Sequence, residues 1–145
     1  MMKKNICFNA LFDYVYLYLE ISKKIQDKFN ITWYCARDRE YKILLNNGIA
    51  EDKICKLHDQ LQNNKLFHEI DESVFTAASI FSADRFLKNK NLEFKKRIIR
   101  TAQSNFLSFL KINNIELVFG EPVNAVDLAI VNICKTHGIK YIYPQ

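Results

Sequence analysis

The 145-residue sequence is poor in turn-forming residues, with only 3 glycines and 2 prolines. An all-β sandwich with many turns needs more of both, so their shortage favours long helices joined by short loops. The 4 cysteines include no C-x-x-C pair, which argues against a zinc site. A secreted scaffold held by disulfides is usually smaller and denser in cysteine. We therefore expect buried, reduced thiols, no metal site and a cytoplasmic location.

The sequence also lacks a long apolar run and a strong charge of one sign. The run from Tyr14 to Leu19 lies between Asp13 and Glu20 and is too short to span a bilayer. No small-residue cleavage site follows the lysines near the N-terminus, so we expect no signal peptide. A net charge of +5 is too small for a dedicated nucleic-acid binder, and nucleic acid is not an expected partner.

Five short β-type runs alternate with helical patterns along the chain. The runs are nearly continuous in apolar residues, as in strands buried on both faces of a parallel sheet. The expected strands cover residues 5–10, 31–36, 53–57, 116–120 and 140–143. The expected helices lie within 11–29, 39–47, 72–88, 94–110 and 126–137. Pro122 is expected to open the last helix and Gly138 to close it.

This alternation predicts the α/β class, as one Rossmann-like three-layer domain over residues 1–145. Its five-stranded, mainly parallel sheet is expected in the order 3-2-1-4-5. Such domains usually carry a helix after the last strand, whereas this sequence stops at Gln145, just after a strand. We therefore expect the chain to be the N-terminal part of a longer, two-domain protein.

Ligands of such sheets bind at the carboxyl ends of the strands where the strand order reverses, here between the first and fourth strands. Six polar residues are expected near that point: Asn9 and Asp13 after the first strand, Arg37 and Arg39 after the second, Glu121 and Asn124 after the fourth. The first strand-to-helix turn contains no glycine, so a dinucleotide pyrophosphate has no close approach to the backbone. We expect neither NAD nor FAD in the usual mode, and the sequence has no P-loop motif.

Glu121 lies in a Gly-Glu-Pro turn at a strand end and is the first candidate for a general base that deprotonates an acceptor hydroxyl. The alternative is a carboxylate that binds the free backbone N–H groups of the next helix. Asp13 is the second candidate, with an exposed first-turn acid as its alternative. Arg37 and Arg39 have guanidinium groups suited to a phosphate or an acidic sugar, or form an ordinary charged helix start.

Aromatic residues crowd the same corner of the predicted fold: Phe8, Phe12, Tyr14, Tyr16 and Tyr18. Packing in the core is their simplest interpretation, and stacking under a sugar ring is the alternative. His58 and His68 are expected to face solvent in a loop, and His137 to cap helix carbonyls.

A basic cluster runs from Asp84 to Arg100, with seven cations against two anions and thus a net charge of +5. Such a face can meet anionic lipid headgroups or a polyanionic glycan. The alternative is a solvated helix face.

Several short motifs follow one another in a characteristic order. They are a first turn without glycine, Ala-Asp-Arg at 83–85, a long helix, Leu-Val-Phe-Gly-Glu-Pro at 117–122, an apolar helix, and His-Gly-Ile-Lys-Tyr-Ile-Tyr-Pro at 137–144. This order resembles the N-terminal half of GT-B glycosyltransferases, most of all those of bacterial capsule and surface-polysaccharide biosynthesis.

The resemblance implies a two-domain enzyme that requires no metal and whose N-terminal domain binds a glycan or lipid-linked acceptor. A nucleotide-sugar donor would bind a C-terminal domain outside this sequence, supplied in cis or in trans. Glu121 and Asp13 would then lie where the catalytic acid or base acts, and the basic cluster could contact the inner face of the membrane. Two alternatives stay open: a non-catalytic α/β module that binds a partner, and half of a nucleotide-sugar epimerase.

Overall fold

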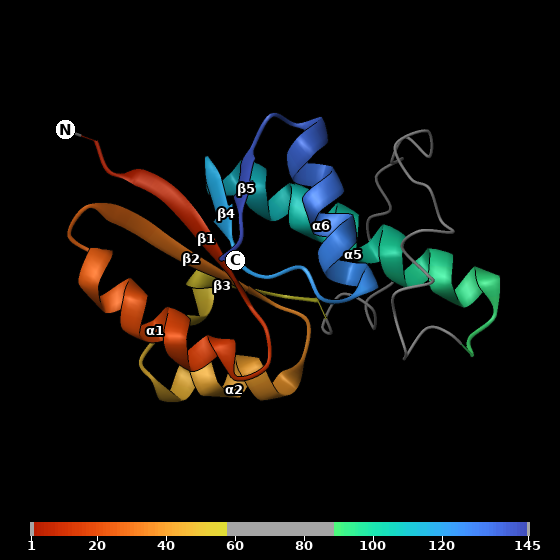
Figure 1. Cartoon of the computed structure of the whole chain (residues 1–145), viewed down its shortest axis with the longest axis horizontal. Coiled ribbons are helices and arrows are strands. Elements are labelled where there is room, and N and C mark those ends of the chain that lie inside the picture. Colours follow the sequence, from red (N-terminus) through yellow and green to blue (C-terminus); the bar gives the residue numbers. More distant parts are fainter. Residues whose placement is uncertain (1, 58–88, 145) are drawn as a thin grey trace.

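A computed structural model describes residues 2–57 and 89–144, in which a five-stranded parallel sheet lies between two pairs of helices (Figure 1). The strands pair in the order β3-β2-β1-β4-β5, and every pairing is parallel. Their bounds are β1 Lys4–Ala10, β2 Phe29–Cys35, β3 Ile54–Lys56, β4 Leu117–Phe119 and β5 Lys140–Ile142. The α/β class and the strand order expected from the sequence are confirmed.

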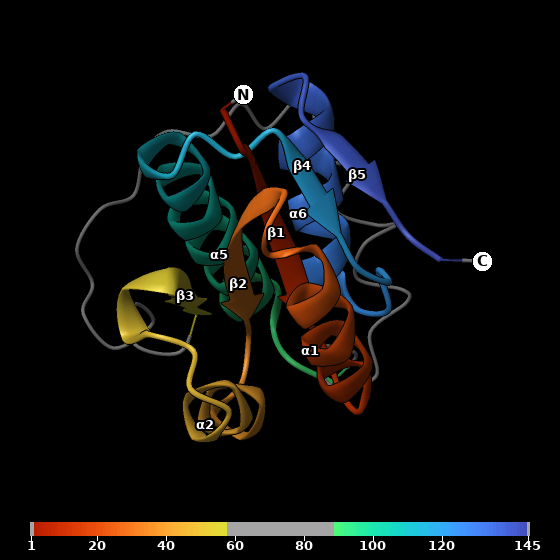
Figure 2. The ribbon, with the colours of Figure 1, turned by 90° about the vertical axis from the view of Figure 1, so that its left-hand side faces the viewer.

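The helices divide between the two faces of the sheet (Figures 1 and 2). One face is covered by α1 (Tyr14–Ile25) and α2 (Asp38–Asn46), and the other by α5 (Leu92–Ile112) and α6 (Ala125–Thr136). A short 3-10 helix, η1 (Glu51–Lys53), leads into β3. Three layers result, because right-handed crossovers between parallel strands place each connecting helix against the sheet.

Alternate residues of β1 enter two separate cores. Phe8 packs with Val15 and Trp33 under α1, whereas Cys7 packs with the apolar sides of α5 and α6. The Phe8 and Trp33 rings stack with centroids 5.0 Å apart. Since both faces of the central strands are buried, their sequences need no polar alternation, which explains the continuous apolar runs.

The ends of the helices agree with the sequence at one position and differ at another. Gly138, with φ of 68°, follows α6 in the left-handed conformation that glycine adopts readily. Pro122 does not open α6, because Asn124 is the N-cap and the helix begins at Ala125. The expected helix within 72–88, His58, His68 and the Ala-Asp-Arg segment lie outside the described residues. Among the described helices, none is long and apolar enough to span a membrane.

All four cysteines are buried and free of disulfides. Burial raises the pKa of the Cys7 and Cys55 thiols above their ordinary value, and that of Cys134 to about 12. The thiolate is the reactive form, so these cysteines are chemically inert in the native state.

We expect Ellman's reagent to modify none of the four thiols quickly in the native chain at mildly alkaline pH. After unfolding in guanidinium, all four should react at the rate of a free thiol, because burial and the raised pKa are then lost. Absorbance of the released thionitrobenzoate measures both rates. Fast modification of even one native thiol would contradict this packing.

Candidate functional site

The carboxyl ends of β1 and β4 meet where the strand order reverses, which is the usual ligand position in open α/β sheets. Gly120 follows β4 and lies directly against Asn9 at the end of β1. A Cβ atom on Gly120 would lie 2.7 Å from Asn9 Cβ and 3.0 Å from the Asn9 carbonyl oxygen. A glycine is therefore required here, and its close approach brings the turn that carries Glu121 beside β1.

Asn9 is buried and its side chain links three elements of the fold. Asn9 Nδ2 donates a hydrogen bond to Asp127 Oδ1 on α6 at 2.8 Å and a longer one to the Tyr141 hydroxyl on β5 at 3.4 Å. Burial raises the pKa of Tyr141 well above its ordinary value. The Asn9 amide thus holds β1, β5 and α6 together at the carboxyl edge of the sheet.

Asn124 and Asp127 form a capping box at the start of α6. Asn124 Oδ1 accepts from the Asp127 backbone N–H at 3.0 Å, and Asp127 Oδ2 accepts from the N–H groups of Asn124 at 3.1 Å and Val123 at 3.0 Å. The sequence analysis missed Asp127, although Asn followed three residues later by an acid signals such a box. Asp127 binds the backbone N–H groups of Val123 and Asn124. The general-base role and the helix-capping role of Glu121 both stay predictions.

Glu121 is half-buried and faces the start of α1. Hydrogen bonding to the neighbouring Glu121 side chain, together with its negative charge, raises the pKa of the Tyr14 hydroxyl, which places the two groups side by side. The Tyr14 ring stacks on that of Tyr18, with centroids 6.1 Å apart and planes 19° apart. Glu121 and Tyr14 therefore lie together across the β1–β4 junction.

Tyr18 is fully buried beneath this pair. Within the described part of the chain its hydroxyl has no hydrogen-bond partner, although the Glu121 backbone lies close by. Burial raises the pKa of Tyr18, and the Glu121 backbone offsets part of this rise. A buried hydroxyl without a hydrogen-bond partner costs about 1 to 3 kcal/mol. The Tyr18 hydroxyl thus retains an unused hydrogen-bonding capacity at this corner.

Asp13 and Arg39 form an ion pair that connects the β1–α1 turn to α2. Arg39 Nη2 donates to Asp13 Oδ1, and this bond raises the pKa of the Arg39 guanidinium. The Asp13 side chain is 83% exposed and the Arg39 side chain is 52% exposed. Water therefore screens the pair, and its contribution to stability is small. Although Asp13 occupies the N-cap position of α1, its side chain makes no capping hydrogen bond.

Arg37 binds a buried acid that the sequence analysis did not single out. Its Nε and Nη2 atoms donate to the two carboxylate oxygens of Glu40, at 3.2 Å and 2.7 Å. The Arg37 guanidinium also lies over the Phe12 ring, 4.3 Å from its centroid. Phe12 has φ of 48°, a conformation that few non-glycine residues adopt, so the turn after β1 is strained.

The six residues predicted for the site fall into two neighbouring groups. Asn9, Glu121 and Asn124 lie around the β1–β4 junction, whereas Asp13, Arg37 and Arg39 lie around the turns that follow β1 and β2. The side chains of Asn9 and Asn124 form hydrogen bonds within the fold, and the charge of Arg37 is paired with that of Glu40. The catalytic and binding roles of all six stay predictions.

The sequence matches no protein-family model and no curated protein. The structure is similar to the crystal structure of MurG from Acinetobacter baumannii, a GT-B glycosyltransferase, with a TM-score of 0.60 and 12% sequence identity. The match covers 98% of this chain and 34% of the MurG chain. This chain thus shares the fold of part of MurG and spans about a third of the length of that protein.

Replacing Asp127 with alanine should lower the free energy of unfolding by about 3 kcal/mol. The change leaves the buried Asn9 amide and two backbone N–H groups without their acceptor. Urea denaturation followed by circular dichroism measures the loss. Asp27→Ala removes an exposed acid and should change stability by less than about 0.5 kcal/mol. Equal stability of the two variants would contradict the role assigned to Asp127.

Proposed function

We propose that this chain is the acceptor-binding half of a nucleotide-sugar-dependent glycosyltransferase in the synthesis of bacterial surface polysaccharide, such as capsule. The fold supports the enzyme class. One observation supports the site: the Glu121 carboxylate lies beside Tyr14 at the β1–β4 junction, where Asp127 binds the backbone N–H groups of Val123 and Asn124. The nucleotide-sugar donor binds a second domain, supplied in cis or in trans.

In this proposal the acceptor hydroxyl lies against Glu121 and gives up its proton to the carboxylate. The hydroxyl oxygen attacks the anomeric carbon of the donor sugar, a new glycosidic C–O bond forms, and the bond to the nucleotide phosphate breaks. The nucleotide leaves with that electron pair. A positioned general base of this kind contributes about 10² to 10⁴ to the rate.

The other predicted residues have more limited roles in the proposal than Glu121 has. Asp13 is the second candidate base; its Oδ1 atom pairs with Arg39, and its side chain is exposed. When Arg39 is released from Asp13, its guanidinium binds an anionic group of the acceptor next to Arg37. Asn9 and Asn124 hold the strand and helix ends that flank Glu121, and their contact with substrate stays a prediction.

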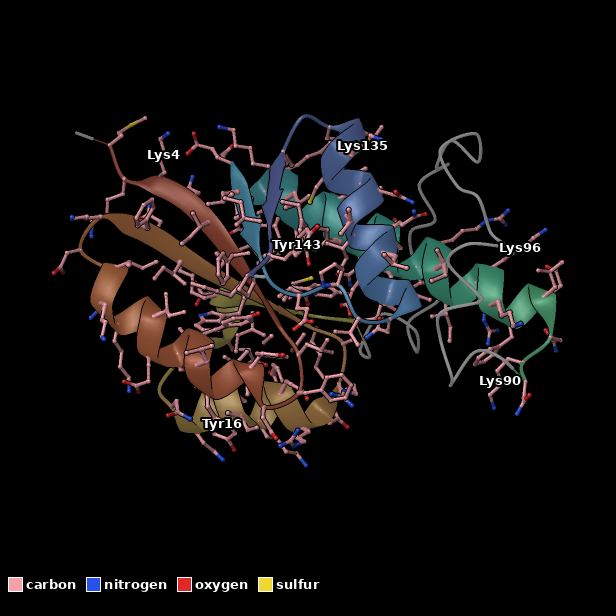
Figure 3. The ribbon with its side chains drawn as sticks, viewed as in Figure 1. Lys4, Tyr16, Lys90, Lys96, Lys135 and Tyr143 are labelled. Carbon is pink, nitrogen blue, oxygen red and sulfur yellow. The ribbon has the colours of Figure 1, made fainter. Side chains whose placement is uncertain are left out.

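The start of α5 carries the described part of the basic cluster. Lys90 and Lys96 lie at the end of α5 that extends away from the strands (Figure 3). A surface cavity of about 460 Å³ there is lined by Asn91, Glu93, Phe94, Lys96, Arg97 and Arg100. We propose that this face contacts the anionic headgroups of the membrane that carries a lipid-linked acceptor.

Glu121→Gln should reduce kcat by about 10²-fold with little change in stability, because the amide cannot take the acceptor proton. The assay follows nucleotide release by a protein that contains this chain and a donor-binding half. Glu116→Gln is the matched control, since Glu116 lies at the opposite end of β4, where its carboxylate accepts a hydrogen bond from the Asn5 backbone N–H. Wild-type turnover by the Glu121 variant would remove this carboxylate from the chemistry.

The double variant Lys96→Glu, Arg97→Glu should lower binding to phosphatidylglycerol-containing vesicles by about tenfold or more, because each basic residue near an anionic surface contributes about 1 kcal/mol. Vesicle sedimentation measures the bound fraction, which should also fall with added salt. Lys23→Glu, Lys24→Glu makes the same charge change at the end of α1 and should bind as the wild type does. No binding by the wild type, or equal loss in both variants, would argue against this face.

A further inference from the structure

The structure separates the aromatic residues of the corner into two kinds. Phe8 and Tyr18 are buried in the core under α1. Phe12, Tyr14 and Tyr16 are 41%, 39% and 51% exposed. Of these three, Phe12 contacts Arg37, Tyr16 lies farther along α1 (Figure 3), and the hydroxyl of Tyr14 meets Glu121.

The Tyr14 ring is held from below by a packed aromatic group. Tyr18 stacks against it, and Tyr18 in turn contacts Phe8 and Phe119, with ring centroids 5.5 Å and 5.4 Å away. Tyr18 thus covers one side of the Tyr14 ring, and Tyr14 remains 39% exposed. Tyr14 is also the first residue of α1, so its backbone is fixed by the helix.

An aromatic face beside a carboxylate matches the chemistry of a sugar ring. The face of an aromatic ring carries partial negative charge, which attracts the polarised C–H groups on the apolar side of a pyranose. The hydroxyls at the edge of that pyranose then need acceptors, and a carboxylate has about four lone-pair sites. Glu121 can therefore accept from a sugar hydroxyl while it remains beside Tyr14.

We propose that Tyr14 is a sugar-stacking residue: the acceptor presents a pyranose ring whose apolar side lies on Tyr14 and one of whose hydroxyls binds Glu121. This inference rests on the proposed function, because it takes the Glu121 corner as the acceptor site. The Tyr14 hydroxyl additionally positions the Glu121 carboxylate.

The probe is methyl β-D-glucopyranoside, titrated into the full chain and followed by amide chemical shifts in NMR spectra. The amides of Tyr14, Gly120 and Glu121 should shift, and glycerol, which has hydroxyls without a ring face, should not reproduce the shifts. Tyr14→Ala should weaken the glucoside by about tenfold, whereas Tyr14→Phe, which keeps the ring, should weaken it only by about threefold or less. Tyr16→Ala removes a neighbouring exposed tyrosine of the same helix and should leave the affinity unchanged.

Several results would overturn the inference. They are the absence of shifts at this corner, equal affinity of wild type and Tyr14→Ala, equal losses in the Tyr14 and Tyr16 alanine variants, or a preference for uridine, whose base can stack on the same ring. Circular dichroism of each variant shows that the fold is kept, and Tyr14→Phe tests the ring itself in a chain with little change in packing.

The transfer assay separates this inference from the proposed function. If sugar is transferred but Tyr14→Ala leaves the KM for the acceptor unchanged, the stacking role fails and the enzyme class stands. If the glucoside binds through Tyr14 but no transfer occurs with a donor-binding half, the enzyme class fails and the sugar site stands.

Discussion

The hydrogen bond from Asn9 to Asp127 is the interaction on which the carboxyl edge of the sheet depends. It joins the end of β1 to the first turn of α6, and the same carboxylate satisfies two backbone donors before that helix. The bond requires β1 and β4 to approach closely, which Gly120 permits because it has no Cβ. With Asp127 capping the helix, Glu121 is left to face α1.

Two ion pairs lie at this edge of the sheet, and they differ in how strongly their charges are neutralised. Arg37 and Glu40 form a two-bonded pair in which Glu40 is buried, and this pair holds the β2–α2 turn. Asp13 and Arg39 form an exposed pair that water already screens and that costs little to open. Glu121 lies beside the Tyr14 hydroxyl, and within the described part of the chain it forms no ion pair.

The likeness to MurG at 12% identity shows how little of a sequence this fold requires. Apolar residues at the strand positions and along one side of each helix suffice to bury both faces of the sheet, and many residue combinations meet that demand. The polar residues at the strand ends are under no such common demand. For this reason fold and chemistry have to be argued separately here, the fold from packing and the chemistry from the residues around Glu121.

The sequence by itself determined the parallel sheet and its strand order, because continuous apolar runs between amphipathic helices leave few other arrangements. It also placed Glu121 and Asn9 at the same edge, since both follow strands that end there. It did not reveal Asp127 as the cap of α6, the buried Glu40 under Arg37, or the pairing of Asp13 with Arg39. It did not distinguish the buried Phe8 and Tyr18 from the partly exposed Tyr14. Only the tertiary structure decided among these residues, because hydrogen bonds and exposure depend on distances between side chains far apart in the chain.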